Sequence, residues 1–236
     1  MCFLFLVGLM AISNPIEKSK IKVQIIINIL YLLIVPILTF TILLAWWFYP
    51  EPYELSQEYI SALGAYFSEN GFPNTISSMI MTIGINACGF ITLTISMIYF
   101  YNPKLDFHNL KSFFNLLLTL GALGVAIPQD HSILRIYHGI GAAVFIVFFG
   151  VLNSVTQLIR FGRKHHRPIH PVKQFEFYKD LTMVIIVILS VVVFIVSYIL
   201  SKTTVILEMG IIARISQKAV LAVDCVAIFF LDVDDM

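Results

Sequence analysis

Six apolar runs, each about as long as a membrane is thick, constrain this chain more than any motif does. They lie at residues 23–49, 75–101, 109–127, 133–160, 180–201 and 211–231. A hydrocarbon layer of ~30 Å needs about 20 helical residues to cross, and each run supplies roughly that number. Backbone groups in lipid must find their hydrogen bonds within their own segment, so the runs are expected to be helices. The pattern predicts an all-α membrane protein with six transmembrane helices.

Composition excludes a soluble class. Hydrophobic residues make up 59% of the 236 residues and charged residues only 12%, and the mean hydropathy is +0.91. One soluble core cannot hide that much apolar surface. The formal net charge of +1 provides no broad basic field, so nucleic acid is not expected as a partner.

The domain organisation follows from the same runs. Residues 1–22 are predicted to form a short apolar, interfacial segment and a basic turn, because the apolar stretch at 1–12 is only about half the length of a span. Residues 23–231 form the six-helix transmembrane domain, and residues 232–236 form an acidic tail. The longest acidic connection, 50–74, contains four glutamates and no Lys or Arg.

The distribution of basic residues predicts the orientation. Cytoplasmic loops carry an excess of Lys and Arg. Eleven of the fifteen basic residues fall on one side of the predicted spans: Lys18, Lys20, Lys22, Lys104, Lys111, Arg160, Arg163, Lys164, Arg167, Lys173 and Lys179. Both termini are therefore expected in the cytoplasm, the 50–74 loop is expected to face outward, and the plasma membrane is the expected location.

Three short motifs resemble those of the Frag1/DRAM/Sfk1 proteins and of the related DUF998 membrane proteins. They are YISALGAYF at 59–67, LGALGVAIP at 120–128 followed by His138, and GIIARI at 210–215. The resemblance implies a six-helix bundle with the outer loop packed on its mouth. It also implies a role in lipid-anchor remodelling, lipid organisation or autophagy. Ala213 occupies the position where these families have an acidic residue before the arginine.

Costly polar groups near the outward face predict a binding site. Charged and polar residues at membrane depth normally face a partner rather than lipid tails. We expect one polar pocket, suited to a phospholipid or glycolipid headgroup, lined by Ser61, Glu69, Asp130, His131, His138 and Arg214. Helix capping by Asp130 is the plainer alternative for that residue. His131 and His138 are two turns apart, or about 10 Å, too far to share one metal ion, and no metal or other cofactor is expected.

A basic run near the cytoplasmic face allows two interpretations. It contains Arg163, Lys164, Arg167 and Lys173. These residues either follow the ordinary excess of positive charge inside, or they attract anionic inner-leaflet lipid, worth ~1 kcal/mol per basic residue.

Small and buried polar residues predict the helix contacts. Gly121 with Gly124, and Gly139 with Ala143, should allow the third and fourth runs to approach closely. Asp224 lies near the middle of the last run, where a carboxylate is costly, so it should face the bundle.

The function favoured by these features is non-enzymatic. The chain is expected to interact with membrane lipids, to organise them, or to scaffold a partner at the membrane. The alternative is a membrane enzyme acting on lipid headgroups or lipid anchors at the outer interface. The sequence has no HExxH motif, no nucleophile beside a base and no paired carboxylates within a span.

Overall fold

Six α-helices and one short 3-10 helix are the regular elements in the part of the chain that the structure describes. The computed structural model describes residues 15–127, 132–165, 174–203 and 207–231. The elements are α2 (Pro15–Trp47), η1 (Ile60–Gly64), α3 (Thr75–Tyr101), α4 (His108–Val125), α5 (Ser132–His165), α6 (Gln174–Thr203) and α7 (Leu207–Ile228). Within the described residues there is no strand beyond one isolated bridge between Phe67 and Pro73. The all-α prediction is confirmed.

Four of the helices are long and apolar enough to cross a membrane. The qualifying segments are Ser19–Trp47, Thr75–Tyr101, Leu134–His165 and Gln174–Thr203. The helix α4 has 18 residues, or about 27 Å at 1.5 Å per residue, and it includes a lysine. The helix α7 contains four charged residues. The structure therefore supports a membrane protein with four candidate spans, and the crossing of all six helices stays a prediction.

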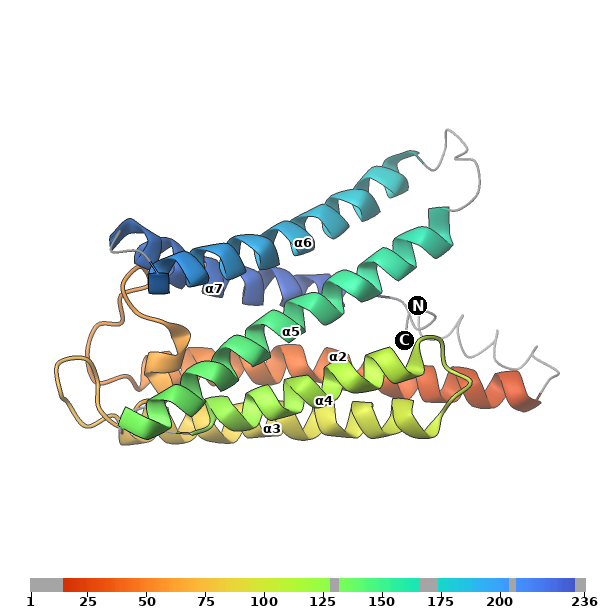
Figure 1. The fold of residues 1–236 in the computed structure, drawn as a ribbon. Coiled ribbons are helices and arrows are strands. Elements are labelled where there is room, and N and C mark those ends of the chain that lie inside the picture. Colours follow the sequence, from red (N-terminus) through yellow and green to blue (C-terminus); the bar gives the residue numbers. More distant parts are fainter. Residues whose placement is uncertain (1–14, 128–131, 166–173, 204–206, 232–236) are drawn as a thin grey trace.

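The helices alternate in direction, so their ends gather at two opposite ends of the bundle (Figure 1). We call the end where α2, α4 and α6 finish the mouth, and the other end the basic end. The helices α2, α3, α4 and α5 contact one another in chain order, and α6 and α7 pair with each other and with α5. The helices α2 and α7 meet along only a short stretch. This seam is the least closed side of the bundle.

Large apolar side chains cover the outside of the bundle. Phe40, Ile83, Phe90 and Phe100 are all more than 60% exposed. Such side chains on every flank are costly in water and favourable in hydrocarbon. Inside, aliphatic and aromatic side chains of all six helices form one core. Asp224 is completely buried, as its position in the last run predicted.

Glycines bring α4 and α5 into backbone contact. A Cβ atom added to Gly124 would lie 2.6 Å from Cα of Gly141, and one added to Gly121 would lie 2.7 Å from Cα of Phe145. The predicted role of Gly121 and Gly124 is confirmed. The prediction for Gly139 is wrong, because a Cβ there would meet nothing within 4 Å. Gly141 takes its place, since the face of α5 toward α4 is rotated by two residues from the expected one.

The connection between α2 and α3, residues 48–74, folds back onto the mouth, and we call it the mouth loop. Side chains at the start of α3 fasten η1: the Asn74 amide donates to the carbonyl oxygens of Leu63 (3.1 Å) and Ala65 (2.8 Å), and Ser77 donates to Leu63 (2.8 Å). From the other side, the Gln217 side-chain oxygen accepts a hydrogen bond from the Ile60 amide at 2.9 Å. Hydrogen bonds with the start of α3 and with α7 thus hold the mouth loop in place.

Candidate functional site

The mouth contains a polar pocket of about 670 Å³ between the mouth loop, the first turn of α5 and the second turn of α7. Its size lies in the ordinary range for small-molecule sites. The polar and charged side chains that line it are Tyr49, Gln57, Glu58, Tyr59, Ser61, Ser68, Glu69, Arg135 and Arg214. Ser61, Glu69 and Arg214, three of the six predicted site residues, come together here.

One wall of the pocket is a fixed acid, Glu58. Its carboxylate accepts hydrogen bonds from the Tyr49 hydroxyl (2.9 Å) and from the Glu54 amide (3.1 Å), and the residue is buried. Burial and the adjacent Glu58 carboxylate together raise the pKa of the Tyr49 hydroxyl, which therefore remains a donor. Each oxygen of the Glu58 carboxylate thus accepts a hydrogen bond from the protein.

A cation, Arg214, also lines the pocket. It lies in the second turn of α7, half-buried, with its guanidinium carbon 5.7 Å from the centre of the Tyr59 ring. Stacking on an aromatic face orients the guanidinium plane and leaves its edge for hydrogen bonding. Within the described residues no carboxylate lies within 4.0 Å of Arg214. Ala213 beside it is fully buried, so the acidic neighbour seen in the resembling families has no counterpart.

Two further side chains complete the pocket. Arg135, one turn into α5, is exposed and lines the same pocket as Arg214. Sequence reasoning missed Arg135 because it was counted as an ordinary helix-end residue. Glu69 is exposed and lies on the mouth loop, and its carboxylate lines the same pocket as the two arginines. The pocket therefore presents cations and hydrogen-bond acceptors to the same space.

The histidine of the predicted site lies elsewhere. His138 is buried, and its Nδ1 atom is 2.7 Å from the carbonyl oxygen of Ile127. That carbonyl follows the end of α4, so His138 ties α5 to the α4 terminus and does not line the pocket. The expectation that it shares the pocket is corrected accordingly. Asp130 and His131 lie outside the described residues.

The basic end contains a buried ion cluster that sequence reasoning did not predict. Asp180 of α6 is 3.1 Å from Arg160 Nη1, 3.0 Å from Lys164 Nζ and 2.9 Å from His165 Nε2. Asp180 and Arg160 are both buried. The available signal was the spacing of Arg160 and Lys164, which puts both on one face of a helix. The cluster fastens α5 to α6.

The predicted inner-leaflet lipid contacts also have protein partners. Arg163 bonds Asp106 at 2.8 Å, and Lys164 bonds Asp180. Arg167 and Lys173 lie outside the described residues. Arg163 and Lys164 thus attach α5 to neighbouring segments of the protein.

No metal cluster of three or more His, Cys, Asp or Glu side chains occurs in the described ranges. No protein-family model, curated protein or solved structure matches the chain. The resemblance to the Frag1/DRAM/Sfk1 and DUF998 proteins stays a prediction.

Proposed function

We propose that the protein is a non-enzymatic membrane protein that binds a phospholipid headgroup in the polar pocket at its mouth. The observation that carries the proposal is the position of Arg214. This cation stands half-buried on an aromatic ring, lines a pocket of about 670 Å³ and has no carboxylate neighbour within the described residues. A charge retained at such a site normally faces a partner.

The chemistry of the pocket favours a phosphodiester that also carries hydroxyl groups. Arginine recognises phosphate through two parallel N–H···O bonds, and Arg135 adds a second positive charge to the same space. Ser61 and Glu69 offer acceptors, which suit the hydroxyl groups of a glycerol or sugar head. A choline head has no hydrogen-bond donor, so these acceptors favour a glycerol-type head over it.

The proposed orientation follows from charge. The basic end carries most of the lysines and arginines and corresponds to the cytoplasmic face. The mouth then opens at the outer leaflet of the plasma membrane, where headgroups of that leaflet lie at the depth of Arg214. Both termini lie in the cytoplasm in this arrangement.

The proposal is tested with sn-glycerol 3-phosphate, a phosphomonoester that carries the phosphate and hydroxyl groups of the proposed head and has no acyl chain. Calorimetric titration of the purified protein in neutral detergent should show binding, and Arg214→Gln should weaken it at least about tenfold, the loss of one charge-assisted hydrogen bond. Lys202→Gln is the matched control, because Lys202 is an exposed cation at the same end that lies on Tyr198 and does not line the pocket.

Thermal unfolding of both variants in detergent checks that the fold is intact. Equal affinity of wild type and Arg214→Gln for glycerol phosphate, or no binding by either, contradicts the proposal.

A further inference from the structure

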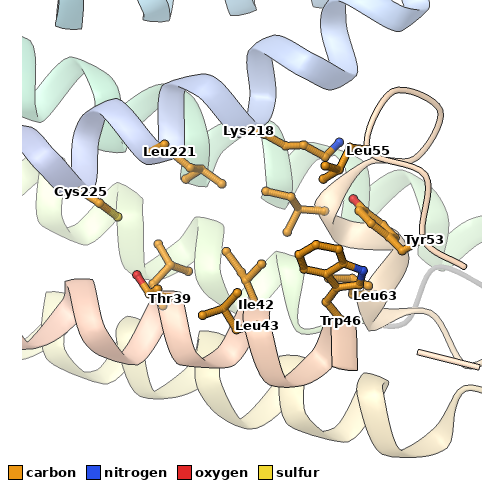
Figure 2. A pocket seen from close by; sticks show the side chains of 13 residues that line it. Thr39, Ile42, Leu43, Trp46, Tyr53, Leu55, Leu63, Lys218, Leu221 and Cys225 are labelled. Atoms are coloured by element: carbon orange, nitrogen blue, oxygen red, sulfur yellow. The ribbon is translucent and has the colours of Figure 1, made fainter. Parts of the chain in front are cut away.

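An apolar groove lies in the seam between α2 and α7 (Figure 2). Ile60 and Leu63 of η1 line this groove, whereas Ser61 and Ala62 of η1 line the polar pocket. It has a volume of about 260 Å³. Ile42, Leu43 and Trp46 line it from α2, and Leu221 and Cys225 face them from α7. Leu43 and Trp46 are also exposed on the outside of the bundle. The groove therefore opens sideways, toward the position of the lipid tails.

One cation stands at the mouth end of this groove. Lys218 Nζ donates to the carbonyl oxygens of Glu58 (2.5 Å) and Arg214 (3.2 Å), and it lies 5.6 Å from the centre of the Tyr53 ring. A lysine ammonium has three donors, so these two bonds leave one. No carboxylate lies within 4.0 Å of Lys218 in the described part of the chain. A positive charge at the end of an apolar groove complements an amphiphile with an anionic head.

The α7 residues that line the polar pocket and the groove change from charged to apolar with depth. Arg214 lines the polar pocket, Lys218 lies one turn deeper, and Leu221, Ala222 and Cys225 continue down the groove. The distance along the axis from Lys218 to Cys225 is about 10 Å at 1.5 Å per residue. One leaflet has about 15 Å of hydrocarbon. The groove thus matches the upper two-thirds of an acyl chain.

We infer that the groove holds one acyl chain of an anionic phospholipid, with Lys218 placed where the chain meets the head. This inference rests on the proposed headgroup function and specifies the lipid further. The phosphate and the head lie at Arg214 and Arg135, the ester region passes Lys218, and the chain descends between α2 and α7. The site then selects a lipid by its negative head and its chain together.

The two tryptophans provide a direct test. Trp46 lines the groove, and Trp47 is 82% exposed on the outside; the chain has no other tryptophan. Trp47→Phe leaves Trp46 as the only reporter of the groove, and Trp46→Phe leaves Trp47 as a reporter of bulk lipid. Both are reconstituted in vesicles in which the acyl chains of either phosphatidylglycerol or phosphatidylcholine are brominated, because bromine quenches tryptophan on contact.

The mole fraction of brominated lipid that halves the Trp46 fluorescence should be about fivefold lower for phosphatidylglycerol than for phosphatidylcholine. This factor corresponds to the attraction of one basic residue for an anionic lipid. Trp47 should show no such preference. Adding Lys218→Met to Trp47→Phe should remove the preference. Ala222→Phe should fill the groove and reduce the quenching of Trp46 by both lipids, and Ala219→Phe, on an exposed position outside the groove, is its matched control.

The inference is overturned if Trp46 and Trp47 are quenched alike by both lipids, or if Ala222→Phe leaves the quenching of Trp46 unchanged. Glycerol phosphate has no chain, so failure of the polar pocket appears in the calorimetric assay and failure of the groove appears here. Selective quenching of Trp46 without glycerol phosphate binding would keep the groove and reject the polar pocket.

Discussion

Breaking the ion cluster at the basic end should be strongly destabilising, and Asp180→Leu removes its centre. Asp180 is only 2% exposed and accepts from Arg160, Lys164 and His165. After the substitution these basic groups lose their shared carboxylate. Lys164 is 35% exposed and can turn toward solvent, but Arg160 is 7% exposed and cannot. The variant therefore takes from Arg160, a buried cation, the carboxylate that it contacts at 3.1 Å.

The expected cost is about 3–5 kcal/mol, the range for breaking a buried ion pair by removing one partner. The chain offers a matched comparison on the same helix. Arg163 bonds Asp106 at 2.8 Å, a shorter distance than the 3.1 Å of Arg160 to Asp180, but the two side chains are 37% and 45% exposed. Such an exposed pair contributes about 0.2–1 kcal/mol. Burial, and not distance, should decide the difference.

The assay is reversible unfolding of the purified protein in mixed micelles, with the free energy of unfolding measured for each variant. Asp180→Leu should be far more destabilising than Asp106→Leu. The double variant Arg160→Met with Asp180→Leu should recover much of the loss, because it removes the buried cation along with its carboxylate partner. Equal costs for Asp180→Leu and Asp106→Leu, or a double variant whose cost is the plain sum of the single costs, would refute this reasoning.

Three further predictions concern the mouth loop, the α4–α5 contact and the topology. Gln217→Leu should leave the Ile60 amide without its acceptor, lower the free energy of unfolding by about 1–3 kcal/mol and speed hydrogen exchange in the mouth loop. Gln157→Leu is the control, because it removes a buried hydrogen bond to Ala227 at the basic end. It should destabilise the protein without faster exchange in the mouth loop. Gly141→Ala should lower the free energy of unfolding by more than 2 kcal/mol, because the added methyl group forces the α4 and α5 backbones apart. Gly139 has open space around it, so Gly139→Ala should be neutral or stabilising by up to about 1 kcal/mol. Cysteines introduced in the mouth loop and at Arg163 should react with a membrane-impermeant reagent from opposite sides; reaction from one side would contradict the proposed topology.

Sequence patterns located the helices well, because hydropathy and helix-breaking residues act locally. The predicted run 75–101 coincides with α3, which follows Asn74 and ends before an Asn-Pro pair, both common at helix boundaries. The predicted run 133–160 is shorter than α5, which continues to His165. Hydropathy marks the apolar part of a helix and not its length, so a polar extension of an amphipathic helix is not visible in that signal.

The pairing of polar residues could not be predicted, because it depends on how helices rotate against one another. Lys111 was expected at the cytoplasmic surface, yet it is buried, with its ammonium 5.4 Å from the centre of the Tyr99 ring. Asp180 was treated as the polar start of a span, yet it faces Arg160. Ser61, Glu69 and Arg214 were grouped correctly because the mouth loop and the start of α7 must share one end of the bundle. His138 was grouped with them by depth alone, but its side chain points to the carbonyl oxygen of Ile127 and not into the pocket.

The most direct test of the proposed function is a density map of the protein in a bilayer containing phosphatidylglycerol. The account predicts a phosphate within hydrogen-bonding reach of Arg214 in the polar pocket, with the connected chain density running past Lys218 into the groove between α2 and α7. Ordered lipid found only on the outer faces of the bundle, with both the polar pocket and the groove empty of lipid, would contradict it.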